Sequence, residues 1–232
     1  MGKTVVIHQP DFLSYLGFFH RFLHADLYVA LDTVQFVTNT SRSWHNRDKI
    51  KTPAGERWLT VAVDKAHAYA VLSDIRLSSR VDWRKDNLNL LRENYRKAPF
   101  FVEIFPRLEE LYGFPAERMV EFNLRSIALL CELFDIRIET KLASDLGTVG
   151  TSNELLVDIL SKVSATRYLS GSGARAYYDP VPFEKAGIEV VWQEFKHPDY
   201  EQLHGAFIPH LSSIDLLLNC GIERSREILR NS

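Results

Sequence analysis

The first 36 residues constrain the fold most strongly, because their pattern is that of strand, turn, helix and strand. A short apolar, β-branched run covers 5–7, and the polar residues 8–11 follow it. The apolar segment 12–23 has the i, i+3, i+4 spacing of a helix buried on most sides, and a second strand-like run covers 27–31. This order is typical of a βαβ unit. We therefore predict an α/β fold with a Rossmann-like, mostly parallel sheet flanked by helices.

Polar side chains are predicted to meet at the carboxyl edge of this sheet, where open α/β sheets bind their ligands. The residues expected there are His8, Gln9, Asp32 and Gln35. Pro10 suits the first turn of a helix, and Asp11 and Ser14 can accept hydrogen bonds from its free N–H groups. A helix N-terminus at this place would favour an anion. The turn after the first strand is therefore our first candidate site.

Composition indicates an ordinary globular chain of 232 residues, 46% of them hydrophobic and 25% charged. We expect 1–232 to be a single α/β domain, with 82–134 as a helical insertion or lobe. A net charge of −2 recruits neither nucleic acid nor membrane. Without a signal-peptide pattern or an apolar run of membrane-spanning length, a cytoplasmic protein is expected. Cys131 and Cys220 fall in apolar helical patterns, which indicates buried thiols rather than a disulfide framework.

The rest of the chain predicts one hairpin, a group of central helices and a return to alternating strands and helices. The predicted elements are a hairpin over 48–63, helices over 82–97, 99–113 and 117–134, a strand over 136–139, a helix over 151–163 opened by a Thr151–Glu154 capping box, strands over 168–170 and 188–193, and between them a short helix from 180. The central helices carry no convergent chemistry and are expected to form a packing layer.

A polar, basic segment over 37–51 is the second candidate site. Cations beside an aromatic ring can hold phosphates while the ring stacks on a base. The candidate ligand-binding residues are Arg42, Trp44, Asn46 and Lys49. The alternative is a solvated loop anchored by one tryptophan.

A glycine- and serine-rich turn after the strand 168–170 is the third candidate site. Such a turn can lay backbone N–H groups around a phosphate. Its residues are Ser170, Gly171, Ser172 and Gly173, with Arg175 beside them. The turn is neither a full GxGxxG motif nor a P-loop, so the motif is weak on its own.

Histidines outside the first turn allow different interpretations. His197 precedes a proline at a strand end and is a candidate catalytic base. His20 and His24 have the i, i+4 spacing of a metal site, but no HExxH context accompanies them, and we expect no metal. Ser212 and Asp215 form a capping box, which gives them a structural alternative to ligand binding.

The sequence resembles the WbqC-like family over nearly its whole length. The stretches that carry the resemblance, in order, are IHQPDFLSYLGFFH, ALDTVQF, SRSWHNRDKIKTPAGERWLTV, RYLSGSGARAYYD and FEKAGIEVVWQEFKHPDYEQLHGAFIPHLSSIDLLLNCG. The family occurs with bacterial surface-polysaccharide (O-antigen) biosynthesis genes, and a transfer of glycine or another amino acid to a sugar has been proposed for some members. The resemblance implies a pathway more firmly than a reaction.

A second, weaker resemblance is to pantothenate synthetase, a nucleotidylyl transferase that forms an acyl-adenylate and then an amide. It implies that His20 contacts ATP phosphates, that Gln35 binds the acid, and that Ser212 and Ser213 belong to a late phosphate loop. The sequence departs from the HxGH motif of that class. Gly17 and His20 are not adjacent, and the first histidine is missing unless His8 replaces it.

These observations predict an N-acyltransferase or amide ligase that attaches an amino acid, glycine among the candidates, to a nucleotide-linked amino sugar. A histidine suits the removal of the amine proton, and His8 and His197 are the candidates. Arg42, Lys49 and Arg175 would hold the diphosphate. Trp44 or Tyr15 would stack on the base, while Asp32 and Gln35 orient the amine or sugar hydroxyls.

Several alternatives stay open at this point. The acyl donor is unknown: ATP with an amino acid and Mg²⁺, an acyl-CoA, or an aminoacyl-tRNA would each serve. A non-catalytic protein that binds a sugar nucleotide, or an assembly partner of the same pathway, would use the same crevice. A nucleic-acid module built on 42–51 is a further hypothesis, which the near-neutral charge disfavours except for a charged tRNA.

Overall fold

The computed structural model describes residues 2–37, 43–65 and 69–232, and within them it contains a five-stranded, all-parallel sheet. The strands are β1 (Thr4–His8), β2 (Leu27–Ala30), β5 (Glu139–Leu142), β6 (Arg167–Ser170) and β7 (Glu189–Trp192). They lie in the order β5-β2-β1-β6-β7, and every neighbouring pair is parallel. The predicted α/β fold with a parallel sheet is confirmed.

The strand order reverses at the centre of the sheet. From β1 the chain builds β2 and β5 on one side, and it then crosses to build β6 and β7 on the other. The gap between β1 and β6 is therefore the topological switch point, where open α/β sheets form a ligand crevice. Val5 pairs with Tyr168, and the same register brings His8 level with Gly171.

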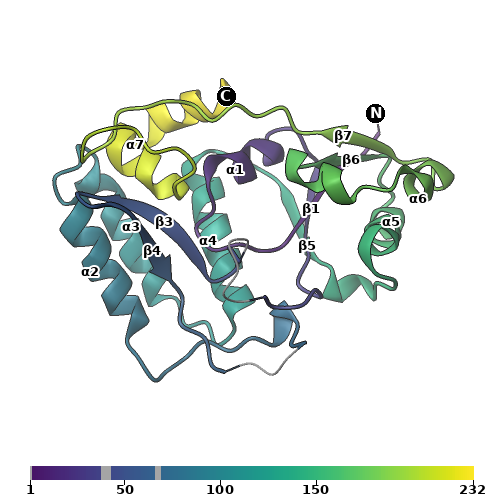
Figure 1. The fold of residues 1–232 in the computed structure, drawn as a ribbon, viewed down its shortest axis with the longest axis horizontal. Helices are drawn as coiled ribbons and strands as arrows, with labels where there is room; N and C mark the ends of the chain where they lie inside the picture. Colours follow the sequence, from purple (N-terminus) through teal and green to yellow (C-terminus); the bar gives the residue numbers. More distant parts are fainter. Residues whose placement is uncertain (1, 38–42, 66–68) are drawn as a thin grey trace.

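Helices cover both faces of the sheet (Figure 1). On one face lie α5 (Ser152–Lys162) and α6 (Pro180–Lys185); on the other lie α1 (Leu16–Phe22), α4 (Met119–Leu133) and α7 (Ser213–Arg230). The strand residues alternate between the two layers, as the period of a strand requires. Val5 and Ile7 pack with α5 and α6, whereas Val6 packs with α1 and α7.

The long connection from β2 to β5 holds an antiparallel hairpin and the central helices. The hairpin consists of β3 (Arg47–Thr52) and β4 (Gly55–Thr60), and the helices α2 (Trp83–Tyr95) and α3 (Phe101–Gly113) precede α4. One apolar cluster joins the hairpin and these helices to the α1 face of the sheet. The division of the chain into domains, with 82–134 as an insertion or lobe, stays a prediction. The remaining short 3-10 turns are η1 (Leu72–Asp74), η2 (Ser144–Leu146) and η3 (Ser172–Tyr177).

The first helix is shorter than the apolar pattern predicts. It begins at Leu16 rather than at residue 12, and its N-cap is Tyr15, without a side-chain cap. The chain before it is an irregular turn in which Leu13 has a φ of 41°. The hydroxyls of Ser212 and Ser213 donate to the carbonyls of Leu13 and Ser14. These hydrogen bonds keep the turn from becoming part of the helix. An anion site at the N-terminus of α1 stays a prediction.

Gly17 is required by close packing, as its position inside an apolar helix suggested. A Cβ at this residue would lie 2.5 Å from a ring carbon of Tyr15. The ring of Tyr15 folds back over the first turn of α1, and only glycine leaves room for it.

Two other sequence predictions are wrong in detail. The strand predicted over 136–139 is β5, which begins at Glu139; Ile136 is instead buried beyond the end of α4, and its N–H donates to the carbonyl of Cys131. Thr151 and Ser212 do stand at helix N-caps, but neither side chain makes a cap hydrogen bond, so the predicted capping boxes do not form.

No helix in the described part of the chain is long and apolar enough to cross a membrane. Both cysteines are free thiols; Cys131 is buried and Cys220 is partly buried. Burial raises the pKa of Cys131 to about 12 and that of Cys220 to about 11, so neither is a reactive thiolate near neutral pH.

Candidate functional site

The switch point brings His8, at the end of β1, beside the turn that follows β6. The Nδ1 atom of His8 lies 3.0 Å from the carbonyl oxygen of Gln9. A carbonyl can only accept, so Nδ1 carries the proton and Nε2 is left with its lone pair. The ring packs edge-on against Phe18 of α1, and 31% of the His8 side chain is exposed.

His8 is a neutral imidazole at pH 7. Burial and the charge of Arg21 lower its pKa from 6.5 to about 4, although Asp11 opposes this shift. His8 is therefore a neutral proton acceptor whose tautomer is held by the backbone.

A buried carboxylate, Asp11, links His8 to the segment before β3. One oxygen accepts a hydrogen bond of 3.0 Å from Nδ1 of His45, and the other lies 3.6 Å from Nδ1 of His8. Asp48 is also buried nearby, and burial raises its pKa well above the ordinary value, with Asp11 adding to the shift. Asn123 of α4 donates to the carbonyls of Pro10 and His45, which clamps the two segments together.

Arg21 of α1 is the charged group at the centre of the crevice. The residue is only 4% exposed. Its guanidinium carbon lies 5.5 Å from the centre of the Phe18 ring, and Nη1 lies 3.7 Å from the place that a Cβ on Gly171 would occupy. Its Nε is buried without a hydrogen-bond partner. A cation is thus held beside the carboxyl ends of β1 and β6.

An apolar pocket of about 200 Å³ adjoins this crevice on the α5 face. Ser170, the last residue of β6, lines it and stands immediately before Gly171. The other walls come from the loop after β2, the first turn of α5, η3, α6 and the end of β7. Its aromatic residues are Tyr168, Tyr177, Tyr178, Phe183 and Trp192. The pocket suits a planar or sugar ring attached to a polar group that reaches the switch point.

The glycine–serine turn lies partly where the sequence predicted it. Ser170 is buried and Gly171 borders Arg21, so both are in the crevice. Ser172 and Gly173 belong to the exposed 3-10 turn η3 rather than to an open anion nest. Arg175 is exposed, and its guanidinium carbon lies 5.2 Å from the centre of the Trp192 ring at the edge of the apolar pocket.

Among the described residues of the basic segment, His45 reaches the crevice through its hydrogen bond with Asp11. The backbone carbonyl of Trp44 accepts from the N–H of Phe12, and the side chain of Asn46 donates to the carbonyl of Val61. Lys49 is paired with Glu56 across the hairpin and lies over the Trp58 ring. Arg42 lies outside the described residues.

Asp32 and Gln35 follow β2 at the same edge of the sheet, on the far side of β1 from Gly171. Asp32 is buried after β2, and its two oxygens accept from the backbone N–H and the hydroxyl of Ser144 at distances of 3.0 and 2.6 Å. This arrangement joins the ends of β2 and β5. Gln35 is exposed and forms a backbone bridge with Val71.

His197 occupies an aromatic cluster between β7 and α7. Its Nδ1 donates to the carbonyl of Pro198, and its Nε2 accepts from the backbone N–H of His210. Both nitrogens are engaged by the backbone, so the ring has no lone pair for a substrate. Burial lowers its pKa, which keeps this arrangement neutral.

Tyr15 and His20 border the same aromatic cluster. Tyr15 packs edge-on against Phe195 and His210. His20 is buried against Phe195, and its Nδ1 lies 3.2 Å from the side-chain amide nitrogen of Gln193. Burial is the main cause that lowers its pKa, and His24 adds to it.

Ser212 and Ser213 are completely buried at the start of α7. Their hydroxyls donate to backbone carbonyls before α1, at distances of 2.5 and 2.7 Å. Asp215 accepts from the hydroxyls of Tyr95 and Tyr200 instead of capping the helix. These residues tie α7 to the first turn, and the two serine hydroxyls have no donor left for a phosphate.

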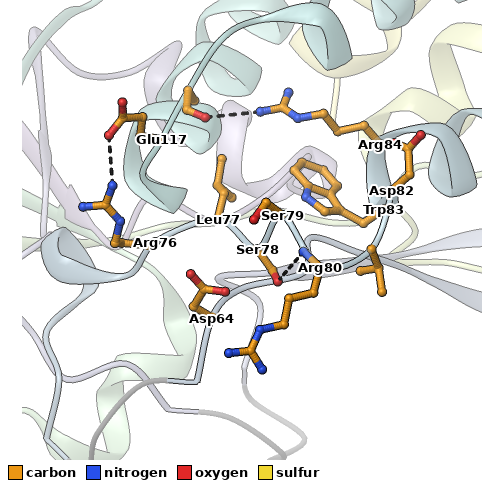
Figure 2. A pocket seen from close by; sticks show the side chains of 12 residues that line it. Asp64, Arg76, Leu77, Ser78, Ser79, Arg80, Asp82, Trp83, Arg84 and Glu117 are labelled. Carbon is orange, nitrogen blue, oxygen red and sulfur yellow. Dashed lines mark hydrogen bonds and ion pairs between the residues drawn. The ribbon is translucent and has the colours of Figure 1, made fainter.

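A larger pocket, of about 560 Å³, opens between Asp64, the segment 76–82, the start of α2 and the chain before α4 (Figure 2). Arg76 pairs with Glu117 across it. Arg84 reaches the carbonyls of Tyr112 and Phe114 and so closes the end of α3. Arg76, Glu117 and Arg84 thus have partners within the fold, and none of the switch-point residues lines this pocket.

Sequence reasoning missed Arg21, and it treated Asp11 only as a cap. A signal for Arg21 was present, because an arginine interrupts a helix that is otherwise apolar on almost every face. Nothing in the spacing links Asp11 to His45, since the contact spans 34 residues and depends on the clamp from α4. Within the described residues, no group of three or more histidine, cysteine, aspartate or glutamate side chains could hold a metal ion.

Comparisons with known proteins found one family and one relative that cover nearly the whole chain. The model of the WbqC-like protein family matches residues 9–227. A protein of Mycobacterium tuberculosis (strain ATCC 25618 / H37Rv), "Uncharacterized protein Rv1507c", is 32% identical over 225 residues, which cover 95% of each chain. No solved structure matches. The family match includes every element that forms the crevice after β1.

Proposed function

Because the chain belongs to the WbqC-like protein family, we propose that it is a cytoplasmic N-acyltransferase or amide ligase of surface-polysaccharide (O-antigen) biosynthesis. It attaches an amino acid, with glycine as the first candidate, to the amine of a nucleotide-linked amino sugar. The observation that carries this proposal is His8: a neutral imidazole at the switch point, with its Nδ1 proton held by a carbonyl and its Nε2 without a hydrogen bond to any described residue.

The shape of the site supports a ligand with a ring and an anionic group. The pocket beside β6 is apolar and lined with aromatic side chains, which favours a nucleobase or sugar ring. Arg21 supplies positive charge next to Gly171 at the carboxyl end of the same strand. A sugar nucleotide combines these two features in one molecule.

The chemistry asked of His8 is a single proton transfer. The amine nitrogen of the sugar attacks the carbonyl carbon of the acyl donor, and a carbon–nitrogen bond forms. The bond to the leaving group then breaks, and the leaving group departs with its electron pair. Nε2 of His8 accepts the proton that the nitrogen must lose. Asp11 lies close enough to stabilise the imidazolium that results, at 3.6 Å from Nδ1.

Three classes of acyl donor fit this reaction. ATP with a free amino acid and Mg²⁺, an acyl-CoA and an aminoacyl-tRNA each place a good leaving group on the acyl carbon. His20, Ser212 and Ser213 are engaged in internal contacts, so we do not assign them to ATP. Asp32 and His197 are likewise left out of the catalytic machinery, because their polar atoms already have partners.

The test is an assay of amide formation with amino-sugar nucleotides and each of the three donor classes, glycine first. His8→Gln should lower kcat about 10²–10⁴-fold, while binding of the sugar nucleotide, measured by calorimetry, changes little. His24→Gln is the matched control, because His24 is an exposed histidine at the far end of α1. It should leave both quantities unchanged.

Full turnover by His8→Gln would exclude this histidine as the base. Binding of the sugar nucleotide by the wild-type protein without amide formation from any of the three donors would instead support a binding protein of the same pathway.

A further inference from the structure

We propose that Arg21 is the phosphate-binding residue of the switch point: its guanidinium, beside Gly171, receives the diphosphate of the ligand. This inference deepens the proposed function and rests on it for the identity of the ligand. The presence of a site for phosphate oxygens stands on the geometry alone. Sequence reasoning had placed this role on Arg42, Lys49 and Arg175.

Arg21 is a buried charge that forms no ion pair with any described residue. An arginine is always protonated, and a buried charge is costly unless it is paired. The residue is 4% exposed, and its Nε has no hydrogen-bond partner. None of the ion pairs between described residues includes Arg21, in contrast to Arg76, Arg92 and Arg107, which lie opposite glutamates.

Phe18 and Gly171 are the neighbours that define the place of the guanidinium. The Phe18 ring lies under the guanidinium at 5.5 Å. Gly171 is its neighbour on the β6 side, where a Cβ would come within 3.7 Å of Nη1. A side chain larger than a methyl group at this position would cover the nitrogen. Glycine leaves Nη1 uncovered on the β6 side.

The chemistry of arginine favours a phosphate ester as the anion. The planar fork of arginine matches the oxygens of a phosphate, with two parallel hydrogen bonds. Ser170 lines the apolar pocket and the next residue, Gly171, borders the guanidinium, so the two parts of the site lie on consecutive residues at the end of β6. A ring joined to a diphosphate spans this arrangement, whereas a free inorganic anion would use only half of it.

An anion at this position also acts on His8. The charge of Arg21 is, after burial, the second cause that lowers the pKa of His8. Phosphate oxygens on the guanidinium cancel that charge and raise the pKa toward its ordinary value of 6.5. The base becomes a better proton acceptor when the sugar nucleotide is bound, which would couple occupancy of the site to catalysis.

The experiment measures thermal unfolding with inorganic pyrophosphate and with uridine diphosphate as probes. At 100 times the dissociation constant, a probe should raise the wild-type Tm by about 5 °C or more. Arg21→Met should lose this rise and, without a probe, should be at least as stable as wild type, because an unpaired buried charge is gone. Arg167→Met is the matched control: Arg167 stands at the opposite end of β6 in an exposed pair with Glu189. It should keep the full rise.

Titration of the His8 ring by NMR gives a second measure. Pyrophosphate should raise the His8 pKa in the wild-type protein and not in Arg21→Met, in which the pKa is already higher. If Arg21→Met does not fold, Arg21→Lys serves, since it keeps the charge but loses the fork. It should bind pyrophosphate at least tenfold more weakly.

A Tm rise that persists in Arg21→Met, or a wild-type protein that binds neither probe, would overturn the inference. A rise with uridine diphosphate alone would support it and identify the ring as part of the ligand. The proposed function fails separately: Arg21-dependent binding without any amide formation would retain the anion site and remove the transferase. Amide formation that survives Arg21→Met undiminished would do the reverse.

Discussion

His8 links the pH dependence of stability to the crevice. Its native pKa of about 4 lies below the ordinary 6.5, so between these values the unfolded chain binds a proton that the native protein does not. Stability contributed by His8 therefore rises with pH through this window and is constant above it. The groups that face the ring are Asp11, Arg21 and His45. His8→Gln should reduce the gain in unfolding free energy between pH 5 and pH 7 by roughly 2 kcal/mol.

Urea unfolding of both proteins at the two pH values measures this difference. His20 and His197 also have lowered pKa values and supply a residual gain in the variant. An unchanged gain in His8→Gln would mean that the imidazole titrates alike in the native and unfolded states.

At the level of residues, the sequence predicted position better than role. His8, Gln9, Ser170 and Gly171 were expected at strand ends, and the structure brings these ends together. Asp32 was also expected at a strand end and lies there, but Ser144 uses both of its oxygens. Hydrogen-bond partners come from segments far away in sequence. A polar residue at the right edge therefore cannot be classified as free or engaged from spacing alone.

Gly221 forms the kink in α7. It has a φ of 74° and a ψ of 173° inside α7, and a Cβ there would lie 2.5 Å from the Phe100 ring. Gly221→Ala combines a backbone conformation that alanine disfavours with a clash, so the unfolding free energy should fall by about 2–4 kcal/mol. Gly113→Ala is the control, because Gly113 ends α3 with open space around it. Its effect should lie within about 1 kcal/mol. Chemical denaturation compares the two, and equal losses would contradict this account of the kink.

Elements with strong periodicity were predicted well, and their ends were not. The central helices and the hairpin lie within a few residues of their predicted ranges, because apolar spacing and Asp82 as an N-cap determine them locally. The start of α1 was misplaced by four residues, since Ser212 and Ser213 bind the preceding carbonyls from almost 200 positions away. No local pattern reports such a contact.

The order of strands in the sheet is a property of the whole molecule. The βαβ pattern predicts parallel strands, but the crossing from β5 to β6 over β1 decides which ends become neighbours. That crossing places the glycine–serine turn beside His8. It also leaves Asp32 and Gln35 on the far side of β1 from that turn. The four polar residues expected to converge are therefore divided between two places on the same edge.

Helix α4 supports the site through Asn123, which is fully buried. Its amide donates to the carbonyls of Pro10 and His45 at 2.7 and 2.6 Å, and so joins the turn after β1 to the segment before β3. Asn123→Ala leaves two buried carbonyls without donors. The unfolding free energy should fall by about 2–4 kcal/mol, and His45 should move away from Asp11, which NMR signals of the His8 and His45 rings would report.

Asn87 of α2 provides the comparison for this role. It is also buried, and it donates to one carbonyl of the hairpin, that of Thr60, in a contact that includes none of the crevice residues. Asn87→Ala should cost about 1–2 kcal/mol and leave both histidine signals in place. If the two variants disturb the rings equally, the signals report general loosening of the fold. If only Asn123→Ala disturbs them, α4 sets the geometry of the crevice from outside it and is part of the functional site.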